Sequence, residues 1–196
     1  MEDYLQAITK EEINTLPLGR FEGDIHIITS KKEEEKAYYE LEDETLLGFD
    51  TETRPSFKKG IRYPTSLVQL AGEKAVYLFR LTHIGFPERL QDLLSNPSIT
   101  KVGVAIRDDL KDLKRISKFH PTNFEDLNKI ADYLNLQNKG LRNLTAMFLG
   151  FRISKTNRVS PWHKNQLSDG QITYAATDAW ASREVYLQMK YANLIA

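Results

Sequence analysis

The stretch Leu46-Leu47-Gly48-Phe49-Asp50-Thr51-Glu52 is a compact apolar run that ends in two carboxylates. It predicts a central β-strand, and residues two apart on a strand point to the same face, so Asp50 and Glu52 project side by side. Two adjacent carboxylates repel, and partial burial increases that cost. A divalent cation between them removes the repulsion, and hard oxygen ligands of this kind suit Mg²⁺ or Mn²⁺. The alternative is a strand that runs into a solvated loop, because short acidic motifs often occur by chance.

Strand and helix signals lie on both sides of this run. Before it, residues 24–29 alternate and predict a strand, and Ser30 is a suitable N-cap for a helix to about residue 43. The pair Gly72-Glu73 predicts a tight hairpin between two later strands. The remaining predictions are strands at 65–71, 75–81 and 101–106, helices at 87–95, 108–118, 124–136, 140–149 and 168–190, and loops at 53–64 and 153–166. This order indicates an α/β fold with a mixed β-sheet flanked by α-helices.

A second acidic position lies in QITYAATDAW (171–180), where Tyr174 and Asp178 are four residues apart. Ser168 and Gln171 form a capping-box pattern that predicts a helix start, and residues four apart share one helix face. That face continues in apolar residues, so Asp178 points inward and needs a partner or a metal. The alternative is a Tyr–Asp hydrogen bond inside an ordinary core.

A third acidic position follows the apolar strand in KVGVAIRDDL (101–110). Asp108 and Asp109 open a helix there, and either could be a functional acid. The alternative is simple capping, because acidic residues favour helix N-termini for electrostatic reasons alone.

Taken in this order, the three segments resemble the DEDD 3′→5′ exonucleases, and the chain looks most like ribonuclease D and the Werner-helicase exonuclease domain. The similarity runs from about residue 24 to residue 189. Supporting similarities are SLVQL at 66–70, KGL at 139–141 and SPWHKNQL at 160–167. The resemblance implies a ribonuclease H-like fold.

The resemblance also assigns two positions that the residues alone leave open. Counted from Lys101-Val102-Gly103, the family places its catalytic acid at Asp109, which leaves Asp108 as an exposed acid at the helix start. One branch of the family has tyrosine four residues before the last aspartate, and the other has histidine five before it. Tyr174 and Thr173 stand at those positions, so the chain resembles the tyrosine branch (DEDDy).

By the same resemblance, the site would hold two divalent metal ions, Mg²⁺ or Mn²⁺. Asp50, Glu52 and Asp178 would ligate one ion, and Asp50 would bridge to a second that Asp109 supports directly or through water. Tyr174 would orient the attacking water or help to take its proton. The implied reaction is hydrolysis of DNA or RNA from the 3′ end by a two-metal mechanism, with release of nucleoside 5′-monophosphates.

Two basic loops are expected to flank the metals and hold phosphates without reading sequence. Aromatic residues in these loops, Phe57, Tyr63 and Trp162, could stack on terminal bases. The alternatives are that loop lysines are merely solvated and that Trp162 belongs to the core. The candidate substrate-binding residues are Arg54, Lys58, Lys59 and Arg62 in the first loop and Lys155, Arg158, Trp162 and Lys164 in the second, with His163 beside them.

Composition limits the classes of protein that fit. The chain has 196 residues and no net charge, which favours one domain and argues against a protein that coats nucleic acid non-specifically. It has no cysteine, which excludes thiolate zinc sites and thiol catalysis and fits a reducing compartment. We expect an N-terminal extension at 1–23 and an exonuclease domain at 24–196, with no secretory signal, no membrane span and a cytoplasmic location.

The expected partner is the 3′ end of a DNA or RNA strand. A helicase or repair partner is left open, as is the choice between DNA and RNA. Two other functions remain on the same fold: a catalytically silent nucleic-acid-binding or partner module, and a phosphodiesterase for small oligonucleotides. The presence of all four acids and the tyrosine speaks against the silent module.

Overall fold

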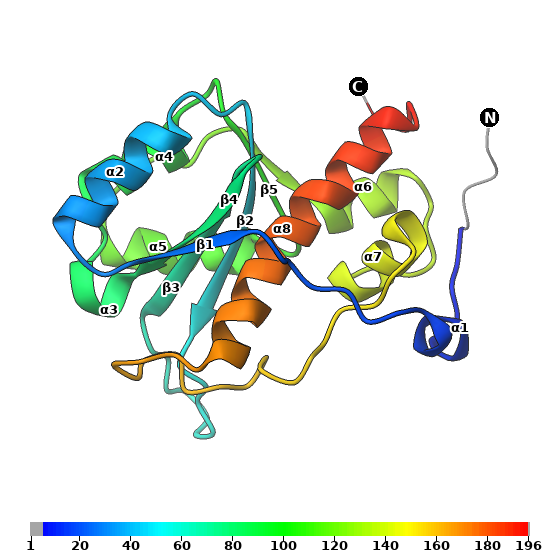
Figure 1. The fold of residues 1–196 in the computed structure, drawn as a ribbon, viewed down its shortest axis with the longest axis horizontal. Helices are drawn as coiled ribbons and strands as arrows, with labels where there is room; N and C mark the ends of the chain where they lie inside the picture. The colour runs from blue at the N-terminus through cyan, green and yellow to red at the C-terminus, as the bar shows by residue number, and fades with distance from the viewer. Residues whose placement is uncertain (1–5, 196) are drawn as a thin grey trace.

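A mixed six-stranded sheet with helices on both faces forms the centre of the molecule (Figure 1). The computed structural model describes residues 6–195. The strand order is β1-β4-β3-β2-β5-β6, and β3 runs antiparallel to both of its neighbours, whereas the other pairs are parallel. The strands are β1 (Asp24–Ile28), β2 (Leu46–Thr53), β3 (Thr65–Ala71), β4 (Ala75–Arg80), β5 (Thr100–Gly103) and β6 (Phe124–Asp126). The predicted hairpin at Gly72-Glu73 is confirmed, because β3 and β4 pair directly across it.

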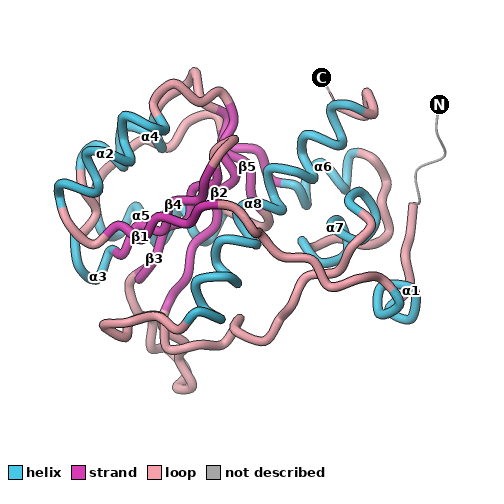
Figure 2. The backbone as a smooth tube through the Cα atoms, viewed as in Figure 1, coloured by secondary structure: helices cyan, strands magenta, loops and turns pink. Residues whose placement is uncertain are grey.

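The helices divide between the two faces of the sheet (Figure 2). Their bounds are α1 (Lys10–Thr15), α2 (Lys31–Leu41), α3 (Leu81–Ile84), α4 (Glu88–Ser95), α5 (Arg107–Ile116), α6 (Leu127–Tyr133), α7 (Leu141–Leu149) and α8 (Asp169–Tyr191). Helices α2, α4 and α5 bury apolar residues against one face, and the long helix α8 packs against the other. Strand alternation sets this division: Val68 belongs to the apolar core on the side of α2, α4 and α5, whereas its neighbour Leu67 belongs to the core beneath α8.

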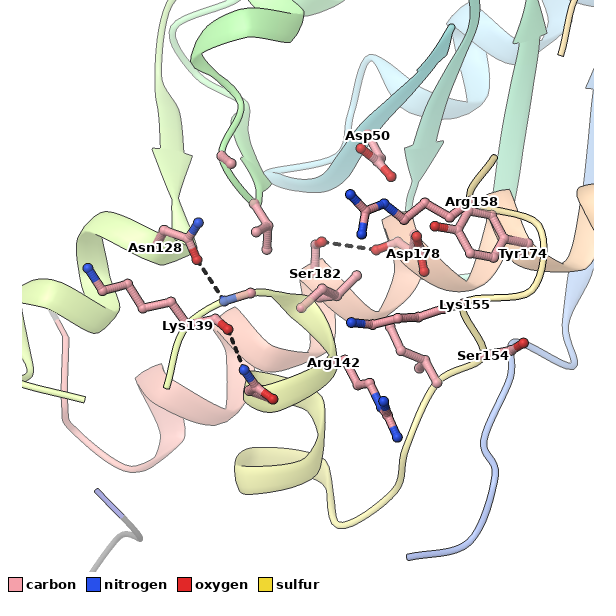
Figure 3. Close-up of a pocket in the computed structure, with 16 residues that line it drawn as sticks. Asp50, Asn128, Lys139, Arg142, Ser154, Lys155, Arg158, Tyr174, Asp178 and Ser182 are labelled. Atoms are coloured by element: carbon pink, nitrogen blue, oxygen red, sulfur yellow. Dashed lines mark hydrogen bonds between the residues drawn. The ribbon is translucent and has the colours of Figure 1, made fainter. Parts of the chain in front are cut away.

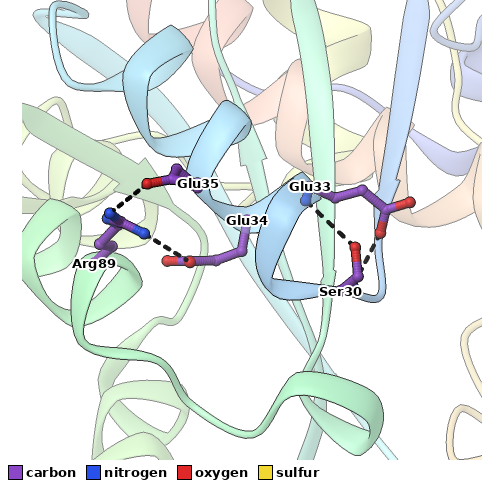
Figure 4. A network of polar contacts seen from close by, with 5 residues as sticks. All are labelled: Ser30, Glu33, Glu34, Glu35 and Arg89. Carbon is purple, nitrogen blue, oxygen red and sulfur yellow. Dashed lines mark hydrogen bonds and ion pairs between the residues drawn. The ribbon is translucent and has the colours of Figure 1, made fainter.

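Helix α2 begins as predicted at Ser30. The Ser30 hydroxyl accepts from the backbone amide of Glu33 at 3.3 Å, and the Glu33 carboxylate accepts from the backbone amide of Ser30 at 2.9 Å. Arg89 of α4 pairs with Glu35 at 2.7 Å and Glu34 at 3.7 Å (Figure 4). These contacts join α2 to α4 on the sheet face opposite α8.

Gly48 allows α8 to lie against the centre of β2. A Cβ atom at this position would lie 2.0 Å from the carbonyl oxygen of Ala179, closer than any real Cβ approaches backbone. Because Gly48 has no side chain, the α8 backbone at Ala179, the residue after Asp178, can lie directly against the strand that carries Asp50. The fold thereby places the two acidic motifs of the sequence against each other.

The predicted helix at 124–136 is wrong at its start. Residues 124–126 form β6, an edge strand that pairs in parallel with β5. Asp126 then caps α6 by accepting from the amide of Asn128 at 3.0 Å, and it also accepts from the amide of Ala105 at 2.9 Å. The strand predicted at 101–106 is correspondingly shorter, because the chain turns at Ala105, where φ is +57°.

The segment before β1 packs against the helical side of the molecule. Ile8 and Ile13 are buried against Ala146 of α7. The Arg152 amide donates to the carbonyl of Pro17 at 2.9 Å. Residues 8–17 therefore brace the chain that leads from α7 into the loop 153–166.

Within residues 6–195, no helix combines the length and the apolar character needed to cross a membrane.

Candidate active site

Three carboxylates from two elements meet at one end of the sheet. Asp50 and Glu52 project from β2 and Asp178 from α8, and one carboxylate oxygen of each lies within 4.8 Å of the others. Strand alternation aligns the first two, and the close approach at Gly48 brings the third. Figure 3 shows Asp50 and Asp178 facing the same space, with Tyr174 next to them. Such a set of hard, clustered oxygen ligands is suited to a divalent cation.

Asp109 lies beside this cluster. It is half-buried at the start of α5, and its carboxylate accepts a hydrogen bond from the hydroxyl of Thr51, which stands between the two acids of β2. The negative charge of Asp109 raises the pKa of both Asp50 and Glu52, so Asp109 interacts electrostatically with the cluster. Asp108 is exposed. Of the two candidates, Asp109 is therefore the one directed at the site.

The carboxylates in the cluster hold protons more tightly than ordinary acids do. Burial, with the charges of Asp178 and Asp109, raises the pKa of Asp50 well above its usual value. Burial and the charge of Asp50 raise the pKa of Glu52 to about 10. Burial raises the pKa of Asp178 to about 7, although a hydrogen bond from Tyr174 opposes the change. A cation that replaced these protons would remove the cost of gathering the acids.

One atom in the cluster points directly to a ligand outside the protein. Asp178 Oδ1 is buried and has no hydrogen-bond partner among the described residues. A buried carboxylate oxygen left unpaired costs free energy, so a cation or an ordered water is expected to occupy this position. The residues present therefore fit a divalent metal ion.

Tyr174 lies one helical turn before Asp178 and is half-buried. Burial and the charges of Asp178 and Glu52 raise the pKa of its hydroxyl far above the usual value. In the metal-free protein the hydroxyl therefore favours its protonated form, which can donate a hydrogen bond. Its chemistry suits orienting a water more than removing a proton.

Comparison with known proteins identifies the family. The profile of a family described as 3′-5′ exonuclease matches residues 25–192 of the chain. The chain belongs to the 3′-5′ exonuclease family. The resemblance expected from the DxE, Asp109 and YxxxD motifs is thereby confirmed.

Individual relatives of this exonuclease agree with that assignment. It is 34% identical over 160 residues to the Mus musculus bifunctional 3′-5′ exonuclease/ATP-dependent helicase WRN, covering 79% of this chain and 11% of that protein. It is 32% identical over 151 residues to a 3′-5′ exonuclease from Arabidopsis thaliana, covering 74% of this chain and 52% of that protein. The chain thus spans from about a tenth to about half of the length of the first curated relatives that it matches.

Solved structures confirm the ribonuclease H-like fold of the exonuclease. The Aedes aegypti Nibbler EXO domain matches with a TM-score of 0.77 at 21% identity, covering 89% of this chain and 94% of that domain. Escherichia coli RNase D matches with a TM-score of 0.74 at 19% identity, covering 88% of this chain and 47% of that one. Trypanosoma brucei RNase D, solved in complex with RNA U12, matches with a TM-score of 0.75 at 20% identity and covers 87% of this chain and 62% of that one.

A cavity of about 440 Å³ opens beside the acids of the exonuclease, lined by Asp50, Tyr174 and Asp178 (Figure 3). Lys155 and Arg158 of the second basic loop also line it, and the Arg158 charge lowers the pKa of Glu52. Sequence reasoning missed four other residues at the site: Lys139 and Arg142 in the lining, Thr51 against Asp109, and Asp126, which holds the turn at Ala105. In the sequence, Lys139 and Gly140 are distinguished only by the KGL stretch that resembles the family.

The other predicted substrate residues are distributed differently. Arg54 and Lys58 line a separate cleft, whereas Lys59, Arg62 and Lys164 are exposed and line neither cavity; Arg62 lies 4.0 Å from Asp112. The prediction that Trp162 stacks on a base is wrong. Its ring is fully buried against α8, with its centroid 6.0 Å from that of Tyr174, so a base cannot reach it.

The raised pKa values predict how metal-free protein responds to pH. In the unfolded chain these carboxyls titrate near pH 4, but in the folded protein Asp178 does so near 7 and Glu52 near 10. Protons bound to these carboxyls therefore stabilise the folded chain fully below about pH 4, and this contribution to the free energy of unfolding is lost as the pH rises through 7 towards 10. The melting temperature in EDTA should therefore fall by several degrees between pH 6 and pH 9. Excess Mg²⁺ should reduce that fall, since a cation replaces the protons; equal slopes with and without Mg²⁺ would contradict the assignment.

Proposed function

We propose that this chain hydrolyses phosphodiester bonds at the 3′ ends of DNA or RNA strands and releases nucleoside 5′-monophosphates. The observation that carries the proposal is the cluster of Asp50, Glu52 and Asp178 oxygens within 4.8 Å, at a cavity that Tyr174 also lines. The family match over residues 25–192 supports the reaction class. The T. brucei neighbour of the same fold was solved with RNA, which supports a nucleic acid as the substrate.

Each residue has a proposed role. Asp50, Glu52 and Asp178 would hold one divalent ion, Mg²⁺ or Mn²⁺, and Asp50 and Asp109 would hold a second. When bound, the pair would lower the pKa of a water and neutralise charge on the phosphate. Thr51 fixes the rotamer of Asp109 through its hydrogen bond. Tyr174 would donate a hydrogen bond to the attacking water and orient it, which is expected from its position beside Asp178 and from the raised pKa of its hydroxyl.

The cations of the second basic loop would bind the backbone of the substrate. Lys155 and Arg158 are exposed and line the cavity that holds the acids. They carry positive charge to a site whose net charge is otherwise negative, so they favour a phosphate there. Arg142 also lines the cavity, but its guanidinium donates to Asn14 at 2.7 Å, which directs part of it away.

The proposal extends to the domain boundaries and the location of the protein. Residues 24–196 would constitute the exonuclease domain and residues 1–23 an extension, consistent with a family match that begins at residue 25. We also propose a cytoplasmic location, with which a chain that has no cysteine is compatible. Within this family, the runner-up function is hydrolysis of short oligonucleotides, which the same acids would support.

The proposal is tested with single-stranded DNA and RNA 20-mers labelled at the 5′ end. We expect a ladder of shortening products with Mg²⁺ or Mn²⁺ and no products in EDTA, because the carboxylates need a cation to act on phosphate. Dinucleotides cleaved much faster than 20-mers would favour the short-substrate phosphodiesterase. Folded protein that binds metal and cleaves none of the substrates would support the silent binding module.

A further inference from the structure

A second cavity lies in the loop that follows β2 and is separate from the one that holds the acids. It measures about 300 Å³ and shares no lining residue with the 440 Å³ cavity. Its walls come from two loops far apart in the sequence, 54–63 and 161–163. This cavity, which we call the aromatic cleft, is lined by residues that include Arg54, Phe57, Lys58, Tyr63, Pro161 and His163.

The aromatic cleft has the chemistry of a surface that binds a nucleobase. The Arg54 guanidinium lies over the Tyr63 ring, 4.3 Å from its centroid, which makes a flat, positively charged stack. Phe57 is 87% exposed, a large cost for an apolar ring that has no role on the surface. No carboxylate is found among the described residues that line the cleft. Exposed aromatic faces beside cations bind bases by stacking, with little dependence on sequence.

Both walls of the cleft are tied to the catalytic residues. Arg54 follows Glu52 by two residues, so their Cα atoms are at most about 7 Å apart. Pro161 and His163 flank Trp162, whose buried ring packs against Tyr174. The cleft is therefore held within a few nucleotides of the acids, although it does not contain them.

We propose that the aromatic cleft binds an unpaired base upstream of the 3′-terminal nucleotide, so that the substrate of this chain is a single-stranded 3′ end. This inference rests on the proposed exonuclease function. A base that stacks in the cleft cannot remain stacked in a duplex beside its neighbours, which disfavours blunt double-stranded ends. Phosphates next to that base would contact Lys58 and Arg54. The burial of Trp162 leaves Phe57 and Tyr63 as the aromatic residues of the two basic loops that a base can reach.

The experiment is a cycle that removes the base from the substrate and the ring from the protein. Two single-stranded 20-mers are compared, one unmodified and one abasic at the three positions directly upstream of the 3′-terminal nucleotide. Wild type should prefer the unmodified strand in kcat/KM by at least about fivefold, the weakest effect expected of one stacked base. In Phe57→Ala the preference should approach one, and in Phe57→Trp it should persist. The control is Tyr133→Ala, an aromatic ring that is 79% exposed on α6 outside the cleft, and it should behave as wild type.

The outcomes separate this inference from the proposed function. A wild-type preference that Phe57→Ala retains would overturn the aromatic cleft, as would cleavage of a blunt duplex as fast as a single strand. If wild type cleaves neither strand, the exonuclease proposal fails, and the cleft is judged by the dissociation constants of the same two strands, measured by fluorescence anisotropy. Weaker binding of the unmodified strand by Phe57→Ala, by at least about fivefold, would then support the cleft, and unchanged binding would overturn it.

Discussion

Replacing Asp50 with asparagine is expected to lower the rate of phosphodiester hydrolysis by on the order of 10³-fold or more while the chain stays folded. The charges of Asp178 and Asp109 both raise the pKa of Asp50, and Asp50 lines the cavity together with Asp178 and Tyr174. Asparagine has nearly the same shape but no charge, so the proposed metal site would lose the ligand that its two ions share. The measurement is the single-turnover rate on a labelled 20-mer with saturating Mg²⁺.

The same substitution should stabilise the metal-free protein. In EDTA, Asp50 is a half-buried carboxyl next to other acids, and removing its charge removes their repulsion. Thermal melts at pH 8 should show a higher melting temperature for Asp50→Asn than for wild type, and a smaller gain on addition of Mg²⁺. Loss of activity together with loss of the folded signal would mean that Asp50 is structural.

The neighbouring pair of acids on α5 provides a matched control. Asp108→Asn removes an exposed charge at the helix start and should change the rate by no more than about twofold. Asp109→Asn removes the partner of Thr51 and should impair catalysis severely. Equal effects of the two substitutions would contradict the assignment of Asp109, and full activity of Asp50→Asn would contradict the metal site itself.

The local geometry of the site could be predicted because it depends on short periods. Alternation on a strand aligns Asp50 with Glu52, and the helical repeat aligns Tyr174 with Asp178. What joins the two pairs is tertiary: the helix reaches the strand because Gly48 has no side chain to hold off the carbonyl of Ala179. Neither strand alternation nor the helical repeat predicts that contact. The expectation that the two pairs meet came from the order of the motifs in the family.

The predictions that were wrong or missing also concern features that depend on tertiary contacts. Strand β6 has three residues, too few to show alternation, and it exists because β5 offers an unpaired edge. Trp162 lies in a basic loop, and the sequence does not show whether its ring faces solvent or the core. In the folded chain the ring packs against buried residues of α8. Lys139 and Arg142 precede and open a helix far from either acidic motif in sequence, so only folding shows that they line the cavity.

Replacing Tyr174 with phenylalanine is expected to lower kcat by about 10²-fold while metal binding persists. The ring still fills its place against Trp162, so the core is retained and only the hydroxyl is lost. Burial and the charge of Asp178 raise the pKa of that hydroxyl, so it acts as a hydrogen-bond donor in neutral solution. The substitution should lower the whole pH–rate profile, and in the metal-free protein it should raise the pKa of Asp178, because the hydrogen bond from Tyr174 that lowers that pKa is lost. The gain in melting temperature on addition of Mg²⁺ should stay close to that of wild type, since Tyr174 is not a proposed ligand.

Tyr186→Phe, at a half-buried tyrosine farther along the same helix, is the matched control and should leave the rate within about twofold. An unchanged rate in Tyr174→Phe would show that the hydroxyl serves only to hold Asp178 in place, and the positioning of water would then have to be assigned to the carboxylates alone.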